Sequence, residues 1–444
     1  MRAQRAQPLA GDGRPSVILS VIAGAVVFAG TVTQTPSRFV YDAATYWAGS
    51  VSLAHGRDPY VDGMLNLRGL LTSVLYLPAA LATRAFGDAA GGMAVLVQNS
   101  LLVSLVGALL LPRFLRIWVP VTPWMVGVCA GLTLLLVGRF APYPLTDLWA
   151  AALMLAAVVV LQRSTAIGVL SAGLFAGIAF NLRPAYLVPL LLAMAAVLFR
   201  QRLAGLWFAA GVGVALVPQS ILNLRHGAGL RLWPVDTAPL AKLQAQLASY
   251  IVRYDTAVYG VARHPQQHFC SPELAQLVGD DPPRSIGGLA SLYLHNLPQA
   301  AVFTSEKVAS ALHWPLSAPY FVPRGAGDLV FALLTTAVAV VGFAALVHAQ
   351  SWSGFRCAPV AVWVAFVVWL GSLATIMTSQ PETRFALPLV LFGIAGCSLL
   401  VRGRLSIRGV AGAVVAVAAV FAIGTVGLSH PSPGPVSPAT CAAR

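Results

Sequence analysis

The chain has 444 residues, of which 58% are hydrophobic and only 9% are charged. A soluble protein carries about 25% charged residues, so this composition excludes an ordinary soluble domain. The formal charge of +14 raises the question of nucleic-acid binding. Most of the basic residues, however, stand at the ends of apolar runs and form no patch interleaved with aromatics. We therefore expect an all-α, polytopic membrane protein that binds no nucleic acid.

Apolar runs long enough to cross a bilayer recur along the chain and predict about eleven transmembrane helices. The first run follows a polar, Arg-containing N-terminus. A signal peptide is the alternative for this run, but no small-x-small cleavage site follows it cleanly. The expected spans are 16–33, 91–111, 121–138, 146–162, 165–181, 185–199, 204–222, 327–347, 358–377, 385–401 and 409–428.

Positive charge sets the orientation of these spans. With the N-terminus inside, every inner loop contains Arg and none contains an acid. Apart from Asp12, every Asp and Glu falls on the outer side, where we expect ionisable chemistry to be concentrated. The segment 66–86 is apolar enough to span, but a span there would invert the downstream loops. We expect it to lie in the outer interface instead.

The outer segments divide the chain into parts of unequal length. Helices are expected near 238–254 and 286–312 inside the larger of them. The expected parts are a transmembrane module at 1–222 with a first outer loop at 34–90, a large outer loop at 223–326, C-terminal spans at 327–428 and an extended outer tail at 429–444.

Cysteines and histidines show no convincing metal spacing. Cys129, Cys357 and Cys397 lie in or beside spans, which is typical of packing residues, whereas Cys270 and Cys441 both lie outside and could meet. His264 and His268 precede Asp280 and Asp281, but Pro265 interrupts a regular helix between the two histidines. We expect no bound metal and no cofactor.

The first outer loop opens with "FVYDAATYWAGSVSLAHGRDPY" (39–60). Trp47, Val51 and Ala54 share one helical face, which predicts an interfacial helix with that face in lipid. Asp42 stands at its first turn, where it either caps backbone amides or acts as a base at the membrane boundary. Asp58 precedes a proline and is favoured as a turn residue.

Further polar residues stand at outer ends of later spans. Asp147 (or Thr146 before it) caps a helix, or Asp147 faces the same outer cavity as Asp42. Arg183 in "AFNLRPAYLVP" either snorkels to lipid headgroups or binds an anion. Arg384 in "TSQPETRFALPLVLF" has a planar fork that suits phosphate oxygens, and Glu382 either orients it or is itself functional.

This pattern resembles the GT-C glycosyltransferases. The resemblance covers the architecture of most of the chain and rests on the first-loop aspartate, on an aspartate at a later span and on "PETRFALP". These transferases include protein O-mannosyltransferases, lipid A aminoarabinose transferases and actinobacterial envelope mannosyl- and arabinosyltransferases. Here Ala43 replaces the second acid of the O-mannosyltransferase "DE" pair, and their "HPP" stretch is missing, which favours a lipid or polysaccharide acceptor.

The resemblance implies roles for particular residues. Asp42 matches the catalytic acid, Asp147 a second acidic position, and Arg384 a basic residue near the phosphate of a polyprenyl-phosphate sugar donor. Around them we expect a phosphate site and a pocket for donor and acceptor, completed by Arg183 and Arg68 for the phosphate and by Tyr41, Tyr46, Glu382 and Asp58 for the pocket.

The expected activity is inverting transfer of a mannose- or arabinose-type sugar on the outer face of a bacterial plasma membrane. The protein would contact membrane lipids and a lipid or glycan acceptor. A transporter or flippase is the alternative from another class, although transporters show paired repeats and midplane sites. An envelope polysaccharide ligase or polymerase is a further alternative, and a purely structural scaffold ranks last.

Overall fold

The computed structural model describes most of the chain, and most of the described part is helical. Helices satisfy every backbone hydrogen bond internally, which an apolar segment in a bilayer requires. The described residues are 17–37, 39–62, 68–163, 165–255, 267–316, 318–320, 326–350, 358–402, 407–433 and 437–443.

Each of the eleven predicted spans coincides with a helix, so the predicted fold class of a polytopic helical membrane protein is confirmed. Six helices in the described residues are long and apolar enough to cross a membrane, and shorter apolar helices accompany them. The eleven are α1 (Val17–Val32), α6 (Asp88–Leu105), α8 (Pro123–Val137), α9 (Asp147–Val160), α10 (Ala166–Leu182), α11 (Leu187–Arg200), α12 (Arg202–Arg225), α17 (Ala326–Ala349), α18 (Val360–Met377), α19 (Leu387–Leu399) and α20 (Ile407–Gly427). A π-helical turn (Val106–Leu110) and α7 (Leu111–Leu115) extend α6.

The spans that carry site residues pack closely through small residues. A Cβ at Gly173 of α10 would overlap with the carbonyl of Phe208, and one at Gly211 of α12 with the carbonyl of Leu170. Small residues let backbones approach in the absence of a hydrophobic drive between helices in lipid. The C-terminal end of α10, which precedes Arg183, is therefore held firmly against α12.

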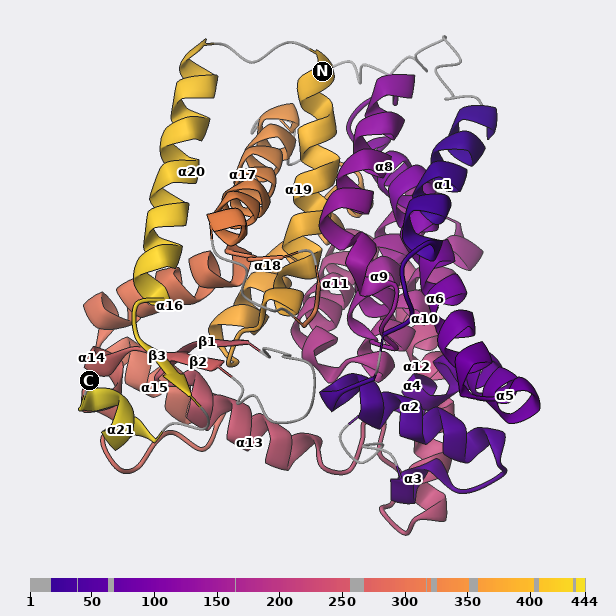
Figure 1. The fold of residues 1–444 in the computed structure, drawn as a ribbon, viewed down its shortest axis with the longest axis horizontal. Coiled ribbons are helices and arrows are strands. Elements are labelled where there is room, and N and C mark those ends of the chain that lie inside the picture. Colours follow the sequence, from indigo (N-terminus) through magenta and orange to yellow (C-terminus); the bar gives the residue numbers. More distant parts are fainter. Residues whose placement is uncertain are drawn as a thin grey trace.

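The first outer loop forms short helices at one end of the bundle, at the bottom of Figure 1. These are α2 (Tyr41–Ala54), α3 (Pro59–Asp62), α4 (Leu71–Leu75) and α5 (Leu77–Phe86). The described part of the 66–86 segment holds α4 and α5, with 5 and 10 residues. At 1.5 Å per residue neither approaches the ~30 Å of a bilayer core, in agreement with the interfacial prediction.

The environment predicted for α2 was wrong in one respect. Its apolar face does not simply enter lipid: Trp47 packs edge-on against Phe39 with ring centroids 5.1 Å apart, and Ala54 is buried. The carbonyl of Ala54 also accepts a hydrogen bond from Arg84 Nη1 at 2.6 Å. The apolar face of this amphipathic helix therefore packs against α4, α5 and their neighbours.

The large outer segment contains a small antiparallel sheet that the all-α prediction missed. Its helices are α13 (Thr237–Ala248), α14 (Pro272–Val278), α15 (Ile286–His295) and α16 (Leu297–Leu312), and the strand order is β1 (Ile251–Asp255), β2 (Gln267–Cys270) and β3 (Pro431–Pro433). The helix predicted at 238–254 ends early because "IVRY" has the β-branched and aromatic residues of a strand. The helix predicted at 286–312 divides at Asn296, before Pro298 in the first turn of α16.

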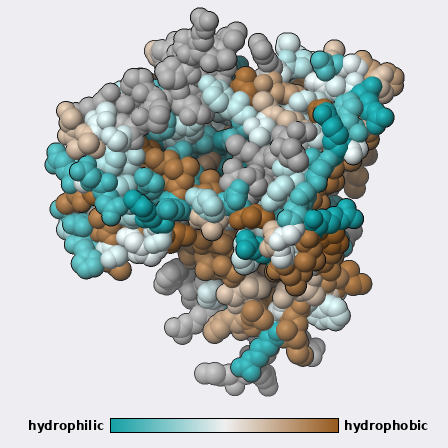
Figure 2. Space-filling model, turned by 90° about the horizontal axis from the view of Figure 1, so that it is seen from below, coloured by the Kyte–Doolittle hydropathy of each residue, from teal (hydrophilic) through white to brown (hydrophobic). Residues whose placement is uncertain are grey.

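The C-terminal tail is tied to this sheet. β3 pairs with β2, and Cys441 in α21 (Pro438–Ala442) forms a disulfide with Cys270, so the suggested meeting of these two cysteines is confirmed. Cys129 and Cys397 are free, with Cys129 buried in the core, and Cys357 lies outside the described residues. The sheet, α13–α16 and α2–α5 lie at one end of the molecule (Figure 1). On this face, hydrophilic side chains lie between apolar patches (Figure 2).

Candidate active site

Asp42 lies in the first turn of α2 but does not cap it. The N-cap residue Val40 makes no side-chain cap bond, and Tyr41 adopts a left-handed backbone conformation with φ of 49°. Such a conformation is costly for a non-glycine residue and is often found at functional sites. Instead of capping, the Asp42 carboxylate accepts a hydrogen bond from Arg384 Nη2 at 2.6 Å, so the capping interpretation was wrong.

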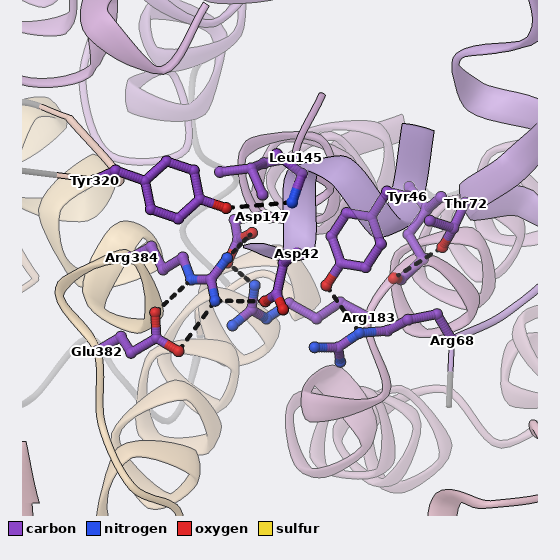
Figure 3. Close-up of polar contacts among 12 residues, drawn as sticks. Asp42, Tyr46, Arg68, Thr72, Leu145, Asp147, Arg183, Tyr320, Glu382 and Arg384 are labelled. Carbon is purple, nitrogen blue, oxygen red and sulfur yellow. Dashed lines mark hydrogen bonds and ion pairs between the residues drawn. The ribbon is translucent and has the colours of Figure 1, made fainter. Parts of the chain in front are cut away.

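Arg384 occupies the centre of the cluster shown in Figure 3. It lies on a short 3-10 turn between α18 and α19, and Glu382 binds it at two points: Nε donates to Oε2 at 2.8 Å and Nη2 to Oε1 at 3.0 Å. The structure thus places Glu382 where it orients the guanidinium. Arg384 Nη1 has no hydrogen-bond partner among the described residues, although Asp147 Oδ2 lies 3.8 Å away.

Asp147 and Arg183 form a second buried pair beside Arg384. Asp147 opens α9, where Thr146 makes no side-chain cap bond, and its carboxylate forms an ion pair with Arg183 Nη1. The Arg183 guanidinium stacks over the Phe385 ring at 4.4 Å. Because the Arg183 and Asp147 side chains are only 4% and 1% exposed, Arg183 does not snorkel to headgroups.

Arg68 enters the site on a loop held by polar residues of the spans. Its Nε donates to Tyr46 Oη at 3.0 Å. The Leu70 amide donates to Gln219 Oε1 at 2.8 Å and the Leu71 amide to Asn181 Oδ1 at 3.0 Å. A Cβ at Gly69 would overlap with Asn181, so a glycine is needed at this approach. Neither Asn181 nor Gln219 was predicted as a site residue, although polar residues inside apolar runs are a signal for such a contact.

Tyr320 is a site residue that the sequence analysis missed. Its hydroxyl accepts a hydrogen bond from the Ala43 amide at 3.2 Å, and its ring lies 6.0 Å from that of Tyr41. Tyr143 meets it edge-on at 5.1 Å. Tyr320 therefore fixes the start of α2 and, with it, the neighbouring Asp42.

The cluster contains as many carboxylates as guanidiniums, but these groups differ in their exposure to solvent. Burial acts to raise the pKa of the Asp42 carboxyl, but the guanidiniums of Arg384 and Arg68 outweigh that effect and hold this pKa below its ordinary value. Asp42 is therefore ionised at neutral pH. Its side chain is 29% exposed, against 8% for Glu382 and 1% for Asp147, so Asp42 is the carboxylate in this group that an incoming molecule reaches most easily.

A small pocket, partly open to the surface, adjoins the buried charges. Asp147, Arg183 and Arg384 line its polar side, while Tyr186, Pro189 and Phe385 are among the residues of its apolar side. The combination fits a ligand with an anionic group joined to an apolar one.

Two sets of predicted residues have their contacts elsewhere. The Asp58 carboxylate accepts from the Tyr60 amide at 2.9 Å and pairs with His226 Nε2 at 2.9 Å. It thus forms the turn favoured on sequence grounds and makes no described contact with the Arg384 cluster. His268 lies on β2 with its ring 4.6 Å from that of Tyr254, and His264 lies outside the described residues.

Comparison with known proteins gives a limited likeness. No family model matches the chain, and no curated protein matches it. Among solved structures it is similar to ArnT from Cupriavidus metallidurans bound to undecaprenyl phosphate, with a TM-score of 0.43 and 15% sequence identity over 92% of this chain. The match spans 64% of the ArnT chain, which is less than two thirds of its length. A likeness at this level assigns neither a family nor an activity to the chain.

Proposed function

We propose that the protein is a GT-C-type membrane glycosyltransferase that uses a polyprenyl-phosphate sugar donor. The observation that carries this proposal is the buried Arg384, whose Nη1 has no hydrogen-bond partner among the described residues, beside the partly exposed carboxylate of Asp42. An Arg fork binds phosphate oxygens well. Because Nη1 is not hydrogen-bonded, it can receive a phosphate oxygen without displacing Asp42 or Glu382.

The adjoining cavity suits the rest of such a donor. A phosphodiester at Arg384 and Arg183 would place the first isoprene units against the apolar wall that includes Tyr186 and Phe385. Arg68, whose charge also acts on Asp42, would face the sugar side of the phosphate. The burial of Asp147, whose side chain is 1% exposed, favours a positioning role for it, since it pairs with Arg183.

In the proposed reaction, an acceptor hydroxyl attacks the anomeric carbon of the donor opposite its phosphate. Asp42 takes the hydroxyl proton as general base. The bond between the anomeric carbon and the phosphate oxygen breaks, and its electron pair leaves with polyprenyl phosphate. Arg384 stabilises the charge that develops there, and the anomeric centre inverts.

The acceptor and the cellular location are further parts of this proposal. Helix α2, which carries Asp42, lies at the same end of the molecule as α21 with the Cys270–Cys441 disulfide (Figure 1), and disulfides persist in oxidising compartments. This supports a site facing the outside of a bacterial plasma membrane. The acceptor is a lipid or glycan of the cell envelope, and the sugar is of the mannose or arabinose type that the motif resemblance implies.

The donor site is tested by lipid binding to the full-length protein in nanodiscs. Undecaprenyl phosphate, the lipid in the ArnT structure, is compared with undecaprenol, which lacks the phosphate. A hydrogen bond to a charged group contributes about 1.5–3 kcal/mol, so the phosphate lipid is expected to bind at least tenfold more tightly. Equal affinities for the two lipids would contradict the phosphate site.

A further inference from the structure

The loop that carries Glu382 and Arg384 is held by the large outer segment. The Tyr254 amide of β1 donates to the carbonyl of Pro381 at 2.8 Å. The Gln380 amide donates to Gln244 Oε1 of α13 at 3.1 Å. Backbone and side-chain contacts from two elements of the outer segment thus fix the residues immediately before Glu382.

Lys307 adds a buried anchor at the start of the same loop. It is fully buried in α16, and its Nζ donates to the carbonyls of Met377 at 2.9 Å and Ala248 at 3.1 Å. These carbonyls lie at the C-terminal ends of α18 and α13, where the last backbone carbonyls lack partners within the helix and accept hydrogen bonds from side chains. Lys307 of α16 therefore ties the end of α18, where the loop begins, to the end of α13.

Asp255 at the end of β1 is the charged member of this support. Its buried carboxylate pairs with Arg253 Nε at 2.6 Å and lies near the backbone amide of Thr383, whose N–H dipole favours the ionised form. Thr383 stands between Glu382 and Arg384. Arg253 Nη1 is held in turn by the carbonyl of His313 at 2.8 Å. A buried carboxylate with two such partners fixes the backbone it binds more tightly than an exposed ion pair does.

We propose that Asp255 is a positioning residue for the phosphate site: its pairing with Arg253 and its attraction for the Thr383 amide, next to the Tyr254–Pro381 hydrogen bond, set the direction in which Arg384 points. This inference rests on the proposed function for its effect on lipid binding, but not for its effect on the loop itself. It assigns a role to the sheet and to the disulfide-bound tail, because β1 pairs with β2 and β2 with β3.

The pairing of Asp255 gives the site a pH dependence. Burial raises the pKa of the Asp255 carboxyl to about 6; the facing Arg253 acts to lower it, and the nearby Glu382 to raise it further. His313 faces Arg253 with its carbonyl, and burial lowers the pKa of its ring to about 4. Above about pH 6, Asp255 is therefore ionised and binds Arg253 and Thr383; below it, protonation weakens both contacts.

The test compares Asp255→Asn with Asp281→Asn, a matched change at an ion pair whose Asp281 side chain is 86% exposed. Undecaprenyl phosphate affinity of the full-length protein is measured from pH 5 to 8, together with amide hydrogen exchange of 378–386. Changes at positions that act on a site through neighbouring residues alter affinity by roughly 2- to 30-fold, so Asp255→Asn is expected to weaken binding within that range at pH 7.5. Below about pH 6, the affinity of Asp255→Asn should approach that of Asp281→Asn. Simple destabilisation of the fold does not produce such a pH dependence.

Faster exchange confined to 378–386 in Asp255→Asn, with Asp281→Asn unchanged, would support the inference. Unchanged exchange and affinity in Asp255→Asn would overturn it, even if the wild type binds the lipid and the proposed function stands. If the wild type binds no lipid, the amide hydrogen exchange of 378–386 still shows whether Asp255 holds the loop. Should Asp255→Asn unfold globally, Arg253→Lys keeps the positive charge but removes the guanidinium that pairs with Asp255: local loosening of 378–386 supports the inference, and none overturns it.

Discussion

Asp42→Asn is expected to reduce sugar transfer by roughly 10²–10⁴-fold, the usual contribution of a positioned general base. Asparagine keeps the shape of the side chain and can still accept a hydrogen bond from Arg384 Nη2, which lies 2.6 Å from the carboxylate. It cannot take the acceptor's proton. The measurement is the transfer rate with a polyprenyl-phosphate sugar donor at saturating acceptor, with the lipid affinity determined in parallel.

Asp88→Asn is a suitable control, since Asp88 is an exposed acid in the first turn of α6. Its transfer rate should equal that of the wild type. Donor affinity in Asp42→Asn should change little, because Arg384 Nη1 remains available. An Asp42→Asn protein that transfers sugar at the wild-type rate would refute the general-base role; lipid translocation that persists in this variant without any transfer would favour a flippase.

Arg384→Lys is expected to weaken donor binding and transfer together, by roughly 10–100-fold, as loss of a charged hydrogen bond implies. Lysine keeps the positive charge among Glu382, Asp42 and Asp147, which limits the damage to folding. It lacks the planar fork that binds Glu382 at two points while presenting a further N–H group. The measurements are undecaprenyl phosphate affinity and the kcat/KM for the donor.

The matched control is Arg284→Lys, because the Arg284 side chain is 65% exposed and pairs with Asp281. Its affinity should be unchanged, and the melting temperatures of both variants show whether either loses stability. Wild-type donor affinity in a folded Arg384→Lys protein would exclude Arg384 as the phosphate ligand.

Most of the membrane fold was predictable because a bilayer imposes one strong rule on apolar sequence. Each apolar run had to become a helix, and each did. The outer segments obey no such rule, and there the predictions were less accurate. "SYIVRYDT" (249–256) could be helix or strand by local pattern; the described part, up to Asp255, becomes β1 because β2 and, beyond it, the distant tail complete a sheet.

The charged core of the site was likewise recognisable, since acids and arginines at span ends stand out in so apolar a chain. Asp42, Asp147, Arg183 and Arg384 do come together, although the sequence did not show which pairs form. Tyr320 was not predictable, because its partner, the Ala43 amide, lies 277 positions away. The support from Asp255 was hidden for the same reason: Thr383 is remote in sequence and contributes only its backbone.

The most direct test of the account is a cryo-EM structure of the full-length protein with undecaprenyl phosphate bound. We expect the phosphate within hydrogen-bond distance of Arg384 Nη1, the prenyl chain along the wall that includes Tyr186 and Phe385, and Asp42 accessible to an acceptor on the side away from the lipid. A phosphate bound elsewhere, with the Arg384 cluster unchanged, would contradict it.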